Sequence, residues 1–304
     1  MKMEENQTKN RTLADYFWIG ARGFAMGASD IVPGVSGGTM AFILGIYDEL
    51  IDAIHSVDIG FIRKVFAFKW REAFSNIPWQ FLLALGLGIA TAVLTLSNGL
   101  HWALETHPIL VWSFFFGLIV SSIIVIRNRV QHWNFLNIFA ALAAAVGAYI
   151  LVGLTPSETP HTPPLLFLSG AIAICAMILP GISGAFILVL LGKYSFVLGA
   201  VKSFDLLTIM LVGLGAVVGL LSFARLLRWT LNKNHDLVVA ILTGFMAGSL
   251  RKVWPWKSFE TISETFIKET NMFPSAFTLE EGLALFLMVA GMTTVLFIER
   301  YANN

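Results

Sequence analysis

A short proline–glycine motif occurs twice in this chain, each time inside a long apolar stretch. Residues 33–39 read PGVSGGT, and residues 180–186 read PGISGAF. Proline and glycine interrupt helices, and a pair of interrupted helices near mid-bilayer is how membrane carriers build a polar site. Irregular backbone at that depth is tolerated only where it is buried in protein or faces water. The duplicated motif therefore indicates a membrane protein with an internal repeat, and it marks the region where a polar ligand is held.

The composition supports this assignment. The chain is 57% hydrophobic and 13% charged, with a mean hydropathy of +0.76. Soluble domains carry about 25% charged residues. The formal net charge is +1, so nucleic acid is not expected as a partner. The sequence has no motif for ATP binding, metal ligation or a serine or cysteine nucleophile, so we expect neither a cofactor nor a metal.

Apolar segments long enough to cross a bilayer are expected at 79–98, 108–126, 135–154, 205–224, 236–250 and 282–299. The two motif regions, 15–46 and 165–192, do not fit a simple crossing. Each is too short for two complete spans, which need about 40 residues, and too interrupted for one. We therefore expect each to form a re-entrant helical hairpin, which turns near the middle of the membrane and leaves on the side it came from.

Positive charges in the links predict the orientation. Links 127–134 and 225–235 contain arginine and lysine, whereas links 99–107 and 155–164 contain neither. The positive-inside rule then places the first two links in the cytoplasm and the other two outside. With this threading, hairpin 15–46 enters from the cytoplasm and hairpin 165–192 from outside, which is an inverted-topology repeat. Link 251–281 is expected outside, although it carries four basic residues among five glutamates.

The sequence thus predicts an all-α, polytopic integral membrane protein with two re-entrant hairpins. A cytoplasmic N-terminus covers 1–14, and the first repeat covers 15–130. In that repeat the hairpin is followed by an amphipathic stretch at 47–78, expected to lie on the membrane surface, and by two spans. A connecting span covers 131–160 and the second repeat 161–250. A loop and a final span make up 251–304.

The two breaks supply a candidate anion site. A new half-helix is expected to begin near Ser36 and near Ser183, where its first N–H groups lack helical partners and attract negative charge. Small residues would let the backbone approach a ligand closely. The alternative is that proline and glycine only kink packed helices. The candidate binding residues at the breaks are Ser29, Asp30, Pro33, Gly34, Ser36, Gly37, Gly38, Thr39, Pro180, Gly181, Ser183 and Gly184.

Two charged residues belong to the first motif region. Arg22 is the only basic residue predicted well inside an apolar segment, and its guanidinium suits a phosphate group. Its alternatives are an anchoring role at the cytoplasmic surface or a pair with Asp30. Asp30 precedes the break, and burial of a carboxyl favours its neutral form, which suggests a proton-coupling role. Its alternatives are a helix cap or a partner for Arg22.

The motif residues carry a resemblance. Residues 27–39 (GASDIVPGVSGGT) and 42–47 (FILGIY) closely resemble the PopT family of bacterial polyprenyl-phosphate transporters, and residues 179–184 (LPGISG) match its second motif. The resemblance covers roughly 12–300. It implies transport of undecaprenyl phosphate, a polyprenyl-phosphate lipid, from the outer to the inner leaflet of the bacterial cytoplasmic (inner) membrane, which recycles the carrier for cell-envelope glycan synthesis. Coupling to a proton or another cation stays open.

Two other classes stay open as well. Undecaprenyl-pyrophosphate phosphatases use similar hairpins and a PGxS motif, but an arginine follows their serine and a glutamate pair supports hydrolysis. Here Gly37 and Gly184 follow the serines, and no glutamate pair occurs in the spans. Ester cleavage needs a positioned base and a charge clamp, so we expect a protein that is not an enzyme. A secondary transporter of another anion or small solute is the remaining alternative.

Overall fold

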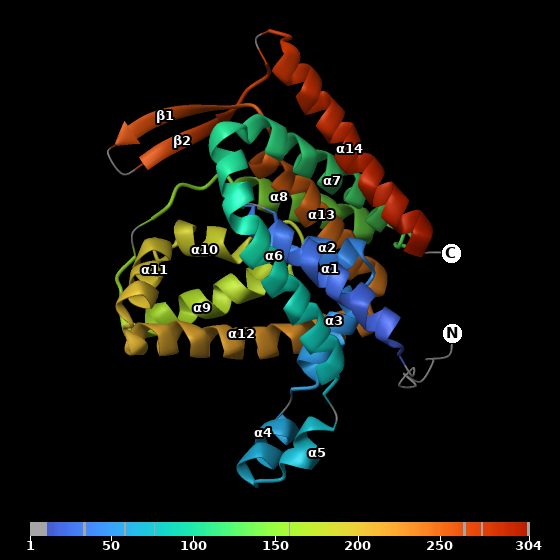
Figure 1. Ribbon diagram of the computed structural model, residues 1–304, viewed down its shortest axis with the longest axis vertical. Coiled ribbons are helices and arrows are strands. Elements are labelled where there is room, and N and C mark those ends of the chain that lie inside the picture. Colours follow the sequence, from blue (N-terminus) through green and yellow to red (C-terminus); the bar gives the residue numbers. More distant parts are fainter. Residues whose placement is uncertain are drawn as a thin grey trace.

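The structure is a computed structural model that describes residues 11–32, 35–57, 59–75, 77–157, 159–263, 266–274 and 276–302. Helices form a bundle with one small β-hairpin at its edge (Figure 1). The helices are α1 (Leu13–Ile31), α2 (Gly37–Ile43), α3 (Tyr47–His55), α4 (Ile59–Phe66), α5 (Trp70–Phe74), α6 (Trp79–Thr106), α7 (Pro108–Arg127), α8 (Phe135–Leu151), α9 (Pro163–Ile178), α10 (Gly184–Leu190), α11 (Tyr194–Ser203), α12 (Leu206–Lys233), α13 (His235–Val253) and α14 (Leu279–Ala302).

Two helix pairs repeat the same packing. Helix α1 packs along α6, and α9 packs along α12. Gly23 faces the backbone of Leu85 so closely that a Cβ atom would overlap its carbonyl oxygen, and Gly170 faces Val212 in the same way. Gly170 follows Gly23 by the spacing of the two motifs, and Val212 follows Leu85 by the spacing of the later spans. The two halves therefore share helix contacts residue by residue.

Two further helix pairs join helices from the first half of the chain to helices from the second half. Helix α7 packs along α14, and α8 packs along α13. Gly117 lies against the carbonyl oxygen of Met288, and its counterpart Gly244 lies against that of Ala141, the counterpart of Met288. The contact pattern thus includes α8 and α14 in the repeating unit. The sequence-based division had left these two helices outside the repeats.

The links between helices gather at two ends of the molecule. At one end, Arg11 pairs with Glu49 at 2.7 Å, and Arg228 pairs with Asp52 at 3.1 Å. At that same end Asp236 accepts hydrogen bonds from the backbone N–H groups at 131 and 132. Arg11, just before α1, therefore lies at the same end as α3 and the links around 127–134 and 225–235. We call this the basic-link end.

The opposite end holds the remaining links and the β-hairpin formed by residues 257–271. We call it the hairpin end, after that β-hairpin. The Arg251 guanidinium donates to the carbonyl oxygen of Tyr149, near the end of α8, at 3.0 Å. The Lys257 ammonium lies over the ring of Trp112, near the start of α7, at 4.9 Å. Arg251 and Lys257 thus lie at the same end of the molecule as the end of α8 and the start of α7, and their side of the membrane stays a prediction.

Two segments differ from the sequence-based expectation. Helix α3 belongs to the stretch expected on the membrane surface, yet Tyr47 and Ile51 are buried and the helix packs against α12. Within this stretch, α4 and α5 are the part that projects from the bundle (Figure 1). In the segment expected to be a loop, β1 (Lys257–Ser263) pairs antiparallel with β2 (Phe266–Asn271). Both strands contain the β-branched and aromatic residues that favour a sheet.

Several helices can cross a membrane. Helices α6, α7 and α12 and residues 279–300 of α14 are long and apolar enough, and α10 with α11, bent by 106°, adds a fifth candidate. Helix α8 is apolar but shorter, with 17 residues, and α13 is not a candidate because Asp236, Arg251 and Lys252 lie near its ends. Large apolar side chains are exposed along α6, α8, α12 and α14. The protein is therefore a polytopic, predominantly α-helical membrane protein.

The grouping of the links predicts which of them share a side of the membrane. In a Cys175→Ala background, Ala103→Cys and Ser258→Cys should react with a membrane-impermeant thiol reagent in intact cells. Gln131→Cys should react only after the cells are permeabilised, because the links with unopposed arginine stay in the cytoplasm. Labelling of positions 131 and 258 from the same side would contradict the threading.

Candidate functional site

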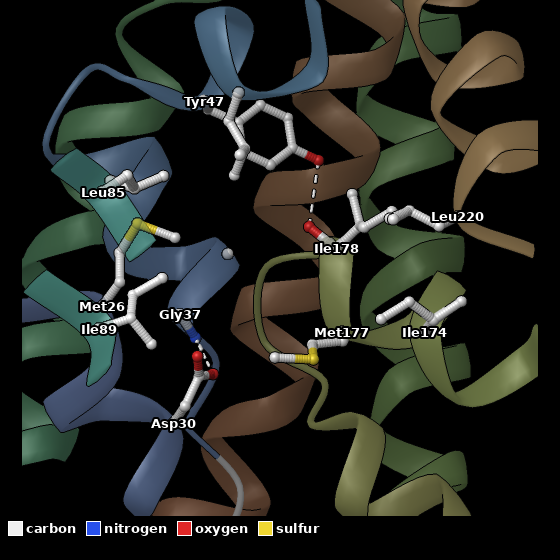
Figure 2. Close-up of a pocket in the computed structure, with 12 residues that line it drawn as sticks. Met26, Asp30, Gly37, Tyr47, Leu85, Ile89, Ile174, Met177, Ile178 and Leu220 are labelled. Atoms are coloured by element: carbon white, nitrogen blue, oxygen red, sulfur yellow. Dashed lines mark hydrogen bonds between the residues drawn. The ribbon is translucent and has the colours of Figure 1, made fainter. Parts of the chain in front are cut away.

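The two interrupted helices meet in the interior of the bundle. Helix α1 ends at Ile31 and α2 begins at Gly37, with Ser36 as its N-cap. Helix α9 ends at Ile178 and α10 begins at Gly184, with Ser183 as its N-cap. The new half-helices therefore start at the two serines that the sequence predicted. Figure 2 shows the first break facing the end of α9.

Three hydroxyl groups, from the first motif region and from Tyr47 directly after it, form hydrogen bonds with backbone groups at the second break. Ser36 Oγ donates to the carbonyl oxygen of Met177 at 3.0 Å, and the Tyr47 hydroxyl donates to that of Ile178 at 3.2 Å (Figure 2). Thr39 Oγ1 accepts from the backbone N–H of Gly181 at 2.9 Å. All three side chains are buried. Backbone groups that lose their helical partners at a break need such replacements in an apolar interior.

The side chain of Asp30, near the end of α1, lies at the N-terminus of α2. Its Oδ1 accepts from the Gly37 N–H at 2.6 Å, and Ser36 Oγ accepts from the Gly38 N–H at 3.1 Å (Figure 2). The first two N–H groups of this half-helix are therefore satisfied by the protein's own acceptors. Asp30 acts here as a helix cap, one of the roles that the sequence left open. A Cβ atom at Gly37 would overlap this carboxylate, so a larger residue there would have to displace Asp30 from the cap.

A cavity of about 180 Å³ lies between the two breaks. Asp30, Gly37 and Tyr47 are among the residues that line it. Apolar side chains from α1, α3, α6, α9 and α12 form the remaining wall, among them Ile89 and Met177 (Figure 2). Of the residues that line it, only Asp30 carries a charge. The cavity thus offers one acidic group in an apolar enclosure.

The polar chemistry of this site belongs to one repeat. By the spacing of the motifs, Met177 corresponds to Asp30 and Phe186 corresponds to Thr39. Ser183 caps α10 without a hydrogen bond from its side chain, unlike Ser36 on α2. Both half-helices thus begin at a serine N-cap, but within the described residues the side chains that bond across the interface come from the first motif and Tyr47.

The other predicted site residues have distinct surroundings. Gly181 adopts a φ of +93°, which favours glycine, and Gly38 packs against the backbone of Ile178. Ser29 is buried beside Asp30, and Gly184 packs against the carbonyl oxygen of Ala173. Pro180 links α9 to α10 and is buried. Pro33 and Gly34 lie outside the described residues.

Arg22 does not line the cavity. It lies on α1, four residues before Met26 and eight before Asp30, and therefore on a similar face of that helix. The side chain is partly buried, and within the described residues it forms no ion pair, neither with Asp30 nor with another carboxylate. Arg22 thus lies on the first half of α1, between the basic-link end and the cavity.

Tyr47 is the site residue that the sequence reading did not single out. It lies at the first position of α3, and its hydroxyl joins the two breaks. Its ring also packs against Phe42 of α2, with centroids 4.9 Å apart. A signal was available, because Tyr194 takes the same position after the second motif.

Comparison with known proteins agrees with this architecture. Residues 26–271 match the undecaprenyl phosphate translocase-like family. The chain belongs to this family. A polyprenyl-phosphate transporter of Vibrio cholerae is 43% identical over 93% of this chain and 96% of its own length. A polyprenyl-phosphate transporter of Staphylococcus aureus is 31% identical over 80% of this chain and 88% of its own length. No solved structure matches the chain.

The bond between Thr39 and Gly181 gives a test of how the breaks are held. Thr39→Val keeps the shape of the side chain but leaves the buried Gly181 N–H without an acceptor, which costs about 1–3 kcal/mol. The unfolding temperature of the purified protein in detergent should fall. Thr39→Ser should retain most of the stability, and Thr95→Val, at an exposed threonine that bonds only within α6, should be neutral. Equal unfolding temperatures for Thr39→Val and Thr95→Val would exclude this role.

Proposed function

We propose that the protein transports undecaprenyl phosphate, a polyprenyl-phosphate lipid, from the outer to the inner leaflet of the cytoplasmic membrane. The observation that carries the proposal is the meeting of two interrupted helices around a cavity with a single charged group, in a chain of the undecaprenyl phosphate translocase-like family. The two relatives, both polyprenyl-phosphate transporters, support the same substrate. Return of the carrier to the inner leaflet supplies envelope glycan synthesis.

The segregation of the links supports an inverted repeat. Arg11, just before α1, pairs with Glu49, just after α2, so the first motif region begins and ends at the basic-link end. The second begins and ends at the hairpin end, where the Ser157 N–H donates to the carbonyl oxygen of Leu190 at 2.9 Å. In this proposal the two hairpins enter the membrane from opposite faces and touch at their tips. Such an arrangement gives a site that can open towards either leaflet in turn.

The acidic group defines how a phosphate is received. A phosphate monoester carries about −1.5 to −2 charges near neutrality, so a charged Asp30 carboxylate repels it. Protonation of Asp30 removes this repulsion and weakens its bond to the Gly37 N–H. The released N–H group then faces the cavity as a donor for the headgroup. We propose on this basis that a proton accompanies the lipid headgroup.

Arg22 supplies the opposite charge in this proposal. It lies about two helical turns from Asp30, towards the basic-link end, and has no carboxylate partner within the described residues. A guanidinium with unused donors in a partly buried position attracts a phosphate and binds it in a bidentate manner. Arg22 thus acts on the headgroup between the cavity and the inner leaflet.

Transport in sealed vesicles tests the function directly. The wild-type protein should move a fluorescent polyprenyl phosphate between leaflets, and Arg22→Ala should reduce the initial rate about tenfold or more, because a charge-assisted contact is lost. Arg22→Lys should restore only part of the rate, since the planar fork is absent. Arg127→Lys, at the exposed last residue of α7, is the matched control for Arg22→Lys. No movement by the wild-type protein would refute the function itself.

The pH profile tests the role of Asp30. Protonation must precede binding of the phosphate in this proposal, so the wild-type rate should rise as the pH falls, at constant membrane potential. Asp30→Asn is neutral at every pH and should show a flatter profile, with only the titration of the phosphate remaining. Asp48→Asn, at an exposed acid on α3, should keep the wild-type profile. A profile for Asp30→Asn identical to wild type would leave Asp30 as a helix cap alone.

A further inference from the structure

Two lysines share one carboxylate at the hairpin end. Lys252, in the last turn of α13, and Lys257, the first residue of β1, each place the ammonium nitrogen 2.9 Å from Oε2 of Glu269 in β2. The side chains are 19%, 5% and 36% exposed, in that order. Lys257 also donates to the carbonyl oxygen of Lys252 at 2.7 Å. An ammonium group this deeply buried is costly, so its position calls for a strong anionic partner.

The charges of this cluster do not cancel. Burial would raise the pKa of the Glu269 carboxyl, but Lys252 and Lys257 outweigh this effect and hold the pKa below its usual range. Glu269 is therefore ionised at neutral pH and balances one of the two ammonium groups. Arg251 adds a third positive charge, and within the described residues its guanidinium contacts the carbonyl oxygen and the ring of Tyr149. The cluster thus retains an excess of positive charge.

A further donor in this segment lacks an acceptor. The indole Nε1 of Trp256 is buried and has no hydrogen-bond partner within the described residues. Trp256 precedes Lys257 in the chain, and its side chain is more than nine-tenths buried. Buried donors without acceptors are uncommon in folded proteins and suggest a site that a ligand completes.

The cluster lies against the second interrupted helix. The Lys252 ammonium sits 5.4 Å from the ring centre of Phe186, the third residue of α10. The Lys257 ammonium sits over Trp112 of α7. A group bound between the two lysines would therefore rest beside the hairpin whose tip reaches the central cavity. Apolar rings on both sides also suit the lipid portion of an amphipathic ligand.

We propose that Lys252 and Lys257 form a docking site for the phosphate headgroup of a polyprenyl-phosphate lipid, which Glu269 occupies until the lipid arrives. This inference rests on the proposed function. A carboxylate oxygen between two ammonium groups takes the position that a phosphate oxygen takes when two lysines bind it. By the threading of the links, the docking site serves the outer leaflet, where the lipid begins its passage.

The β-hairpin positions the Glu269 carboxylate between the two lysines. An isolated two-stranded sheet is marginally stable, so β1 and β2 depend on their contacts with α13. Asn271 Nδ2 donates to the carbonyl oxygen of Arg251 at 2.8 Å, and the Met272 N–H donates to that of Trp256 at 3.0 Å. These bonds place Glu269 over the lysines without a covalent constraint. A dianionic headgroup displaces a single carboxylate because it offers more charge and more acceptor oxygens.

Binding of farnesyl phosphate, a polyprenyl phosphate of three isoprene units, to the full-length protein in nanodiscs tests this proposal. Glu269→Gln removes the competing charge and should tighten binding about tenfold. Lys252→Gln should weaken it by a similar factor. Glu280→Gln, an equal charge change at the start of α14, should leave it unchanged. A merely structural Glu269 would not give tighter binding upon its removal, so the gain separates docking from folding.

The outcomes are distinct. Farnesol should bind equally weakly to all variants, and inorganic phosphate should not displace farnesyl phosphate at equal concentration. Glu269→Gln affinity equal to that of Glu280→Gln would overturn the docking site, as would displacement by inorganic phosphate. If the wild-type protein transports the lipid in vesicles while Glu269→Gln binds no tighter, the docking site alone is refuted and the proposed function stands.

Discussion

The open backbone at the two helix breaks is the constraint on which this structure depends. Each break leaves N–H and C=O groups without helical partners, in a part of the protein where water is scarce. Ser36, Thr39 and Tyr47 supply the missing partners for residues 177–181, so one break is completed by side chains of the other. The second motif region therefore depends on the first for these partners, whereas the first caps its own half-helix with Asp30 and Ser36. The contact between them is thus a requirement of the backbone as well as a place for a ligand.

The division of labour between the repeats follows from this contact. The first repeat carries the hydroxyls, Asp30 and Arg22, whereas Met177 and Phe186 replace polar residues in the second. The second repeat instead receives cations from α13 and β1, which reach Phe186 through Lys252. An internal repeat of near-equal backbone therefore carries different chemistry at its two ends. Such asymmetry suits a transporter whose substrate is collected on one side and delivered on the other.

Local features of the site were predictable from the sequence, whereas contacts between distant segments were not. Ser36 and Ser183 are N-caps because serine before a glycine-rich helix start is a local signal, and glycine spacing indicated the repeat. The bond from Tyr47 to Ile178 joins residues 131 positions apart, and nothing near either residue indicates it. A helix cap was one of several roles predicted for Asp30, because a single sequence does not show which N–H group a carboxylate reaches.

The burial of α3 and the β-hairpin escaped prediction for other reasons. An amphipathic helix suits a membrane surface and a protein surface equally well, so the pattern of 47–55 could not distinguish them. Strands β1 and β2 are short, and their alternating residues lie among charges that read as a loop. The lysines of that segment opposed the predicted orientation only because their partner was unknown. In the structure Glu269 lies between Lys252 and Lys257 and neutralises part of their charge.

The packing of α7 and α8 on helices of the second half determines the order in which the helices can assemble. Gly117 of α7 packs on Met288 of α14, which leaves the ribosome long after α7, while α8 must wait for α13. The translocon therefore releases a first half whose glycine-lined faces are still open to lipid. These helix pairs form only after α13 and α14 have been synthesised. A truncated chain that ends before α14 would insert its earlier helices yet remain a substrate for membrane quality control.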